Sequence, residues 1–88
     1  MDILLIGELF VPSAYILINT EIGFEDRVLK ELKKISNVKE AYVTYGVYDV
    51  IARVYAESMD ELKEIISANI RHLDKVRSTL TMITIGEK

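Results

Sequence analysis

Residues 38–56 read VKEAYVTYGVYDVIARVYA, two runs rich in β-branched and aromatic residues on either side of Gly46-Val47. Such runs favour extended strands, and a glycine at their junction permits the backbone angles of a tight turn. We therefore predict a β-hairpin, with one strand over residues 38–45 and the next over residues 48–56. Alternate positions of the second strand form one apolar face and one partly apolar face.

Helical periodicity flanks this hairpin on both sides. Before it, apolar residues recur every three or four positions over residues 24–35, with acidic residues in the first turn and basic residues in the last. That pattern is typical of an amphipathic helix whose charges complement its dipole. After the hairpin, Ser58 stands three residues before Glu61, the spacing of a capping box, and an apolar stripe follows. We predict a second helix over residues 59–72.

Two more stretches have the character of strands. Residues 14–20 read AYILINT, and residues 76–85 read VRSTLTMITI with alternating polar and apolar positions. The complete order is β-α-β-β-α-β, which is typical of a ferredoxin-like α+β sandwich with a four-stranded antiparallel sheet and two helices on one face. The opposite face has no helix to cover it and is partly apolar, so we expect the domain to dimerise through the sheet.

The N-terminal residues are less regular. We interpret residues 14–88 as the ferredoxin-like domain and residues 1–13 as an N-terminal extension. Within that extension, the apolar residues 2–11 could form a short helix or a strand broken at Gly7, and we favour a strand that pairs with a sheet edge in dimer contacts. They lack the basic start of a signal peptide and are too short to span a bilayer.

Composition restricts the classes of function. The chain has 88 residues, 50% of them hydrophobic, which suits one folded domain. A formal net charge of −3 gives no electrostatic reason to bind DNA, RNA or an anionic membrane. The chain has no cysteine, so disulfides and cysteine-ligated metals are excluded, and we expect a cytoplasmic location.

Few residues have the pattern of a catalytic or metal site. The single histidine, His72, lies at a predicted helix end, where a protonated ring would complement the helix dipole. The acidic residues gather at helix starts and on solvated faces, an arrangement that capping and solubility explain. We therefore predict no enzyme activity, no metal and no cofactor.

The segment Tyr45-Gly46-Val47-Tyr48-Asp49 is the most suggestive of binding, because it places two phenols, a glycine and a carboxylate at a hairpin tip. Glycine lets a ligand approach the backbone, and Asp49 could accept hydrogen bonds from an ammonium group. An ordinary turn, in which Asp49 satisfies the hairpin's own amides, explains the same residues equally well. Thr79 and Thr81 present two hydroxyls on one face of the last strand, although β-propensity alone also accounts for them.

These motifs resemble the effector-binding domain, or RAM domain, of the Lrp/AsnC (feast/famine) transcription regulators. The resemblance covers about residues 14–85 and is carried by the element order, by Gly46-Val47-Tyr48-Asp49 before an apolar strand, and by VRSTLT at residues 76–81. It implies a dimer that associates into larger rings and binds an amino acid in clefts between dimers. The effector contacts that it implies are Gly46, Tyr48, Asp49, Thr79 and Thr81.

The same resemblance bears on partners. Family members carry a helix-turn-helix domain ahead of this one, and the roughly eleven residues before the first strand are too few to form it. The resemblance therefore implies a stand-alone RAM domain that does not bind DNA directly and could assemble with full-length regulators of the family. Leu80 stands where a polar residue is common in relatives, which leaves the effector open.

Three functions remain in view. The leading hypothesis is a regulatory module that binds an amino acid and forms oligomers. The first alternative is a structural assembly domain whose hairpin tip builds an interface without a ligand. The second is a small dimeric ferredoxin-like enzyme, which would need an acid–base group in an apolar pocket.

Overall fold

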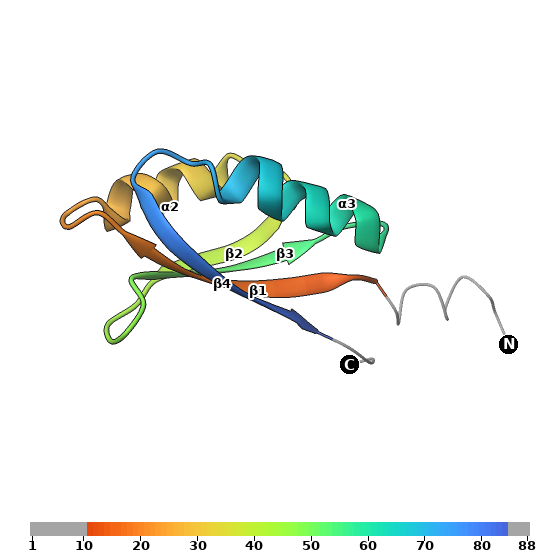
Figure 1. Cartoon of the computed structure of the whole chain (residues 1–88), viewed down its shortest axis with the longest axis horizontal. Coiled ribbons are helices and arrows are strands. Elements are labelled where there is room, and N and C mark those ends of the chain that lie inside the picture. The colour runs from red at the N-terminus through yellow and green to blue at the C-terminus, as the bar shows by residue number, and fades with distance from the viewer. Residues whose placement is uncertain (1–10, 85–88) are drawn as a thin grey trace, which may run out of the picture.

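The computed structural model describes residues 11–84, and its element order confirms the predicted βαββαβ arrangement. In chain order the elements are β1 (Ser13–Thr20), α2 (Glu25–Lys33), β2 (Val38–Val43), β3 (Val50–Tyr55), α3 (Met59–Glu64), a π-helical segment η1 (Ile65–Ile70) and β4 (Val76–Thr84). Because η1 continues α3 directly, the two form one helix (Figure 1). The predicted strand over residues 2–11 lies outside the described residues except at Val11.

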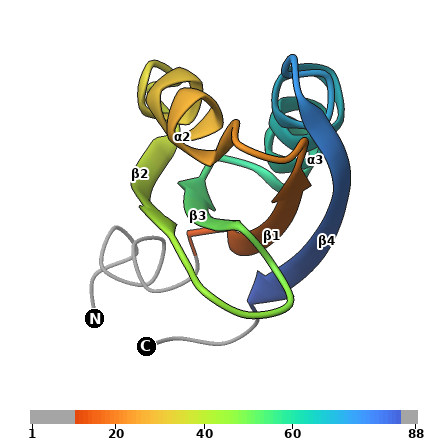
Figure 2. The same cartoon turned by 90° about the vertical axis from the view of Figure 1, so that its left-hand side faces the viewer.

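The four strands form one antiparallel sheet in the order β2-β3-β1-β4. β1 lies in the middle, with Ile16 opposite Ala52 of β3 and opposite Thr81 of β4. Both helices cover the same face of the sheet, as Figure 1 shows from the side and Figure 2 from one end. This is the ferredoxin-like fold that the sequence predicts.

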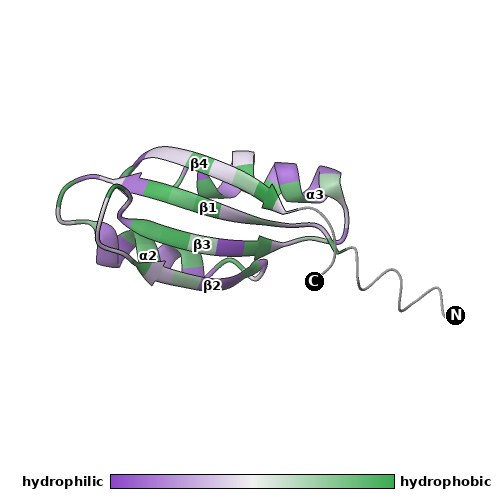
Figure 3. Cartoon of the chain, turned by 90° about the horizontal axis from the view of Figure 1, so that it is seen from below, coloured by the Kyte–Doolittle hydropathy of each residue, from purple (hydrophilic) through white to green (hydrophobic). Residues whose placement is uncertain are grey.

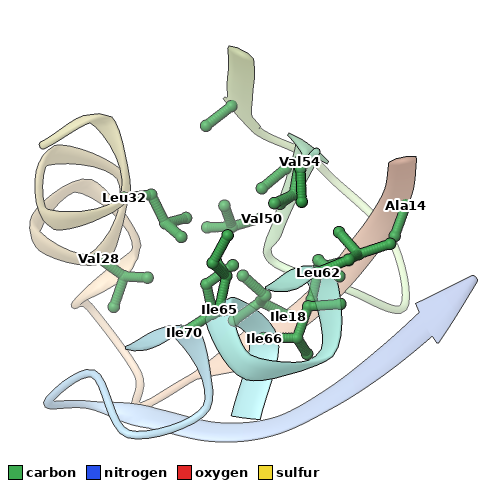
Figure 4. Close-up of a cluster of buried hydrophobic side chains, with 14 residues drawn as sticks. Ala14, Ile18, Val28, Leu32, Val50, Val54, Leu62, Ile65, Ile66 and Ile70 are labelled. Atoms are coloured by element: carbon green, nitrogen blue, oxygen red, sulfur yellow. The ribbon is translucent and has the colours of Figure 1, made fainter. Parts of the chain in front are cut away.

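The core fills the space between the sheet and the helices. Alternation along β1 and β3 directs every second side chain toward the helices, so Ile16, Val50 and Val54 are completely buried. The helices complete the core with Val28, Leu32, Leu62, Ile65, Ile66 and Ile70 (Figure 4). Burying one such aliphatic side chain stabilises the fold by about 1.5–3 kcal/mol, and this cluster therefore holds the helices on the sheet.

The second helix begins with the predicted cap at Ser58, although Glu61 reaches back to the N–H of Glu57 and not to that of Ser58, as a capping box would have it. Ser58 Oγ accepts a hydrogen bond from the Glu61 N–H at 3.1 Å, and Glu61 Oε1 accepts one from the Glu57 N–H at 2.9 Å. The first helix starts differently, since its N-cap residue, Phe24, makes no side-chain capping bond. There the macrodipole is complemented instead by acidic residues in the first turn and basic residues in the last.

The second helix also ends differently from the prediction. The Arg71 N–H donates to the Ile66 carbonyl, five residues back, at 3.0 Å, which closes the helix with π geometry at Ile70. His72, predicted as its last residue, is therefore exposed in the turn that leads to β4. Within residues 11–84, neither helix has the length and hydrophobicity needed to cross a bilayer.

One face of the sheet points away from the helices, and we call it the open face. Its side chains are Tyr15, Leu17 and Asn19 of β1, Glu40 and Tyr42 of β2, Ile51, Arg53 and Tyr55 of β3, and Ser78, Leu80 and Met82 of β4. Figure 3, which looks at the molecule from below, shows hydrophobic and hydrophilic residues side by side on the strands. The partly apolar second face expected from the sequence is present.

Arg53 brings a positive charge to the open face and is surrounded by aromatic rings. Its guanidinium carbon lies 5.4 Å from the centre of the Tyr15 ring and 4.9 Å from that of Tyr55, distances typical of cation–π contacts. Its Nη1 atom is 3.6 Å from the Glu40 carboxylate, which also accepts a hydrogen bond of 3.2 Å from the Tyr42 hydroxyl. These contacts accommodate a charge on a partly apolar surface.

Candidate functional site

The loop between β2 and β3 is wider than a tight hairpin turn. The Thr44 N–H donates to the Asp49 carbonyl at 2.9 Å, and Thr44 Oγ1 donates to the Tyr48 carbonyl at 2.7 Å. Gly46 has a φ of +135°, a backbone conformation that favours glycine. The two strands therefore stop at Val43 and resume at Val50, each two residues farther from Gly46-Val47 than predicted.

Asp49 ties the start of β3 to the end of β1. Its N–H donates to the Ile18 carbonyl at 2.9 Å. Its carboxylate Oδ2 accepts hydrogen bonds from the Thr20 N–H at 2.9 Å and from Thr20 Oγ1 at 3.4 Å. The carboxylate thus satisfies a backbone amide, as the turn interpretation supposes, but that amide belongs to β1 and not to the hairpin.

An open hollow of about 440 Å³ lies beside Asp49, at the end of the molecule where β1 passes into α2. Figure 2 looks onto the end of the molecule that carries the β1–α2 and β2–β3 loops. The residues that line this open space are Asn19, Thr20, Ile22, Gly23, Glu25, Asp49, Arg77 and Ser78. We call this space the hollow. It joins three segments that are far apart in the sequence and that only the sheet brings together.

The hollow carries charges of both signs. Glu25 is the first residue of α2, and Asp49 precedes β3, so two carboxylates reach it from different elements. Arg77 is exposed and lies at an irregularity of the sheet, where Asn19 pairs with Ser78 but the next pair is Thr20 with Val76. A guanidinium and two carboxylates can together recognise a molecule that is itself both positively and negatively charged.

The structure brings only part of the predicted site together. Asp49 lines the hollow, whereas Gly46 and Tyr48 lie farther along the β2–β3 loop and are not among its lining residues. Thr79 and Thr81 share one face of β4, as predicted, but they lie opposite Ile18 and Ile16 and thus on the helix side of the sheet. They do not line the hollow either.

Sequence reasoning missed most of the residues of the hollow. Those not predicted as site residues are Asn19, Thr20, Ile22, Gly23, Glu25, Arg77 and Ser78. One local signal was available, because a glycine, Gly23, closes the loop that follows the first strand. In the structure its φ is +85°, a conformation that favours glycine. The proximity of this loop to Arg77 follows from strand register, which local patterns do not reveal.

Metal binding finds no support among the residues that the structure describes. Residues 11–84 contain no group of three or more histidine, aspartate or glutamate side chains placed to hold a metal ion. Glu25 and Asp49 line the hollow without a third ligand of this kind. The chemistry available there is hydrogen bonding and charge pairing.

Comparison with known families and structures gives a consistent result. The family model described as "Lrp/AsnC ligand binding domain" matches residues 13–88. The crystal structure of FFRP-DM1 is 39% identical, with a TM-score of 0.81 over 84% of this chain and 99% of that one. The match supports the fold over 84% of this chain.

Two curated relatives cover shorter stretches. Regulatory protein AsnC of Haemophilus influenzae is 32% identical over 60 residues, which are 68% of this chain and 40% of that protein. A homocitrate synthase of Saccharolobus islandicus is 40% identical over 58 residues, which are 66% of this chain and only 12% of the synthase. The chain therefore spans less than half the length of the curated relatives it matches. On the match over residues 13–88, the chain belongs to the Lrp/AsnC family and carries its ligand binding domain.

Proposed function

We propose that this domain binds a free amino acid in the hollow and acts as an oligomeric regulatory module. The observation that carries the proposal is that Arg77 and two acidic residues, Glu25 and Asp49, line the same open space. An amino acid at neutral pH has a carboxylate and an ammonium group on the same carbon. Its two charges match the two kinds of charge in the hollow.

Each charged group has a role in this proposal. The Arg77 guanidinium has several N–H donors in a fixed plane and suits the ligand's carboxylate. The Thr20 N–H donates to Asp49 Oδ2, and the Thr20 hydroxyl, which donates to the Glu21 carbonyl at 3.0 Å, lies 3.4 Å from the same Oδ2. Oδ1 of the carboxylate can therefore accept from the ligand's ammonium group. Asp49 would then be held in place by β1 while it binds, which lowers the entropy lost on binding.

The remaining predicted contacts enter the proposal through assembly. The hollow is open on one side, and a neighbouring subunit could close it. We propose that Gly46 and Tyr48, and the Thr79 and Thr81 hydroxyls, contribute at contacts between subunits, since they do not line the hollow of their own chain. Dimerisation through the open face is part of the same proposal.

The comparisons support a sensing role over catalysis. Similar stretches occur in a protein described as regulatory and in a synthase of which they form 12%. A domain that accompanies such different proteins suits ligand sensing, which any of them can use. We propose that the output here is modulation of Lrp/AsnC-type regulators in the cytoplasm by co-assembly, without catalysis and without direct contact to DNA.

Thermal shift and calorimetry with a panel of the common amino acids test this proposal. At least one of them should stabilise the protein at millimolar concentration, because a ligand that binds only the folded state raises its stability. Arg77→Ala should abolish the effect. Arg71→Ala, which removes an exposed arginine outside the hollow, should preserve it. If none of the amino acids stabilises the protein, the proposal is contradicted.

A structural assembly domain is the second candidate, and one observation favours it. Tyr45 and Val47, at the β2–β3 loop, are 102% and 82% exposed, and large apolar side chains so exposed are typical of contact surfaces. If the tip builds an interface, Tyr45→Ser with Val47→Ser should lower the subunit number measured by light scattering. An unchanged subunit number would leave no support for this candidate. The enzyme alternative lacks a comparable observation, since the hollow is mostly polar.

A further inference from the structure

We infer that the hollow prefers a basic amino acid, one whose side chain carries a second positive charge. This inference rests on the proposed function and concerns the same site. It follows from the charges of the lining, which are two carboxylates, Glu25 and Asp49, and one guanidinium, Arg77, among otherwise uncharged residues. The hollow therefore has one negative charge more than it has positive charges.

A zwitterion leaves this excess uncompensated. When the carboxylate of an amino acid pairs with Arg77 and its ammonium group pairs with one acidic side chain, the other acidic side chain has no opposite charge from the ligand. An ammonium or guanidinium on the ligand's side chain would supply it. A side-chain carboxylate would instead meet a like charge, so acidic amino acids should bind worst.

Asp49 and Glu25 differ in a way that assigns their roles. The Asp49 carboxylate is fixed by the hydrogen bond from the Thr20 N–H at 2.9 Å and lies between the end of β1 and the start of β3. Glu25 lies in the first turn of α2, which follows the β1–α2 loop. We assign Asp49 as the partner of the ligand's α-ammonium group. Glu25 is assigned as the partner of the cation at the end of the ligand's side chain.

The nearby cations of the protein are engaged outside the hollow. Arg27 makes an ion pair with Asp74 at 3.3 Å, and its guanidinium lies 5.9 Å from the centre of the Phe24 ring. The Lys75 ammonium lies over the same ring at 4.6 Å. Neither Arg27 nor Lys75 lines the hollow, so neither takes the place of a ligand cation beside Glu25.

The shape of the lining suits a long side chain with a charged end. The volume of about 440 Å³ lies within the usual range of ligand pockets, about 300–1,000 Å³. Ile22 is the one large apolar side chain of the lining, and it is 92% exposed. The methylene groups of lysine or arginine could cover it, which would remove apolar surface from water.

Two matched ligand pairs test the inference by titration calorimetry. Lysine and norleucine have the same carbon chain and differ in the side-chain ammonium group, and arginine and citrulline differ in the guanidinium charge. We expect lysine and arginine to bind about three- to fivefold more tightly than their neutral partners, a range suited to a charge pair in an open site. Glutamate should bind more weakly than either.

Variants then locate the charge. Glu25→Gln should reduce the preference for lysine over norleucine to less than about twofold while norleucine binding is retained. Glu64→Gln, on the exposed side of α3, should leave the preference unchanged. If neutral amino acids bind as tightly as basic ones, the inference is wrong and the proposed function stands. If no amino acid binds, the proposed function fails and the inference fails with it.

Discussion

Asp49 is the residue in which the structural and the binding roles meet. Its Oδ2 atom accepts from the N–H and the hydroxyl of Thr20, a residue that is only 4% exposed. Replacing Asp49 with alanine leaves the Thr20 N–H without that acceptor. We expect Asp49→Ala to lower the free energy of unfolding by about 1–3 kcal/mol, the range for a buried polar group that loses its partner.

Urea denaturation without amino acid checks this prediction. Asp49→Asn is the matched control, because its side-chain carbonyl oxygen can still accept from Thr20, and it should lose less stability than the alanine variant. Equal stability of the wild type and Asp49→Ala would show that the contact with β1 contributes nothing.

Tyr42 provides a pH-dependent test on the open face. Its hydroxyl donates a hydrogen bond to Glu40, and this bond, together with the negative charge of Glu40, raises the pKa of Tyr42 above its ordinary value of 10.0. Because the pKa of Tyr42 is higher in the folded state than in the unfolded state, its contribution to stability is present below pH 10 and is lost as the pH rises through the folded-state pKa.

Ultraviolet titration of the tyrosines can detect this shift. The difference between the wild type and Tyr42→Phe isolates the ionisation of Tyr42. We expect Glu40→Gln to lower the pKa of Tyr42 toward its ordinary value, since the variant removes the charged acceptor. An unchanged midpoint would mean that Glu40 does not govern the pKa of Tyr42.

At the residue scale, the sequence reveals alternation but not direction. It predicts correctly that Thr79 and Thr81 share a face of the last strand. Which face that is depends on the strand opposite, and pairing with Ile18 and Ile16 places both threonines toward the helices. Asp49 stood out because of its local motif. The sequence could not assign Arg77 to the same site as Asp49. β1 pairs between β3, which Asp49 precedes, and β4, which carries Arg77, and only the strand register brings the two residues together.

At the scale of the elements, the cap of the second helix is a quantitative test. Ser58 Oγ accepts from the Glu61 N–H at the first turn of α3. Ser58→Ala should lower the free energy of unfolding by about 1 kcal/mol, the typical cost of losing an N-cap. Ser67→Ala, farther along the same helix and exposed, should change it by less than about 0.5 kcal/mol. Chemical denaturation measures both, and equal losses would refute the cap's role.

Element types and most element starts were predictable, whereas the boundaries at the β2–β3 loop and the end of the second helix were not. Apolar periodicity and the capping box locate both helices because they depend on neighbouring residues along the chain. The end of the second helix depends on one bond, from the Arg71 N–H to the Ile66 carbonyl, that skips an extra residue. The end of β2 and the start of β3 depend on the Thr44–Asp49 contact across the loop. Such contacts leave no periodic pattern in the sequence.

At the scale of the whole molecule, the proposed association through the open face can be tested. Leu80 is 45% exposed and lies opposite Leu17 in the middle of the pairing between β1 and β4. We expect Leu80→Lys to shift the protein toward monomers, because a charge in an apolar interface is costly to desolvate. Light scattering after size exclusion measures the mass.

Met59→Lys is the control for this experiment. Met59 is 39% exposed, close to the exposure of Leu80, but belongs to α3, on the opposite side of the sheet from the open face. Its replacement should leave dimerisation unchanged. If Leu80→Lys keeps the wild-type mass, association through the open face is wrong.

The pairing of β1 with β4 also has a consequence for how the protein is made. Ser13 pairs with Thr84, 71 residues later, although β1 is one of the two inner strands of the sheet. While the ribosome is still adding residues, β1 can pair with β3, but its other edge waits for β4. Until β4 has been synthesised, that edge is an unsatisfied strand open to the wrong partner. We therefore expect the proposed association of subunits to follow translation of this segment, when the last strand has completed the sheet.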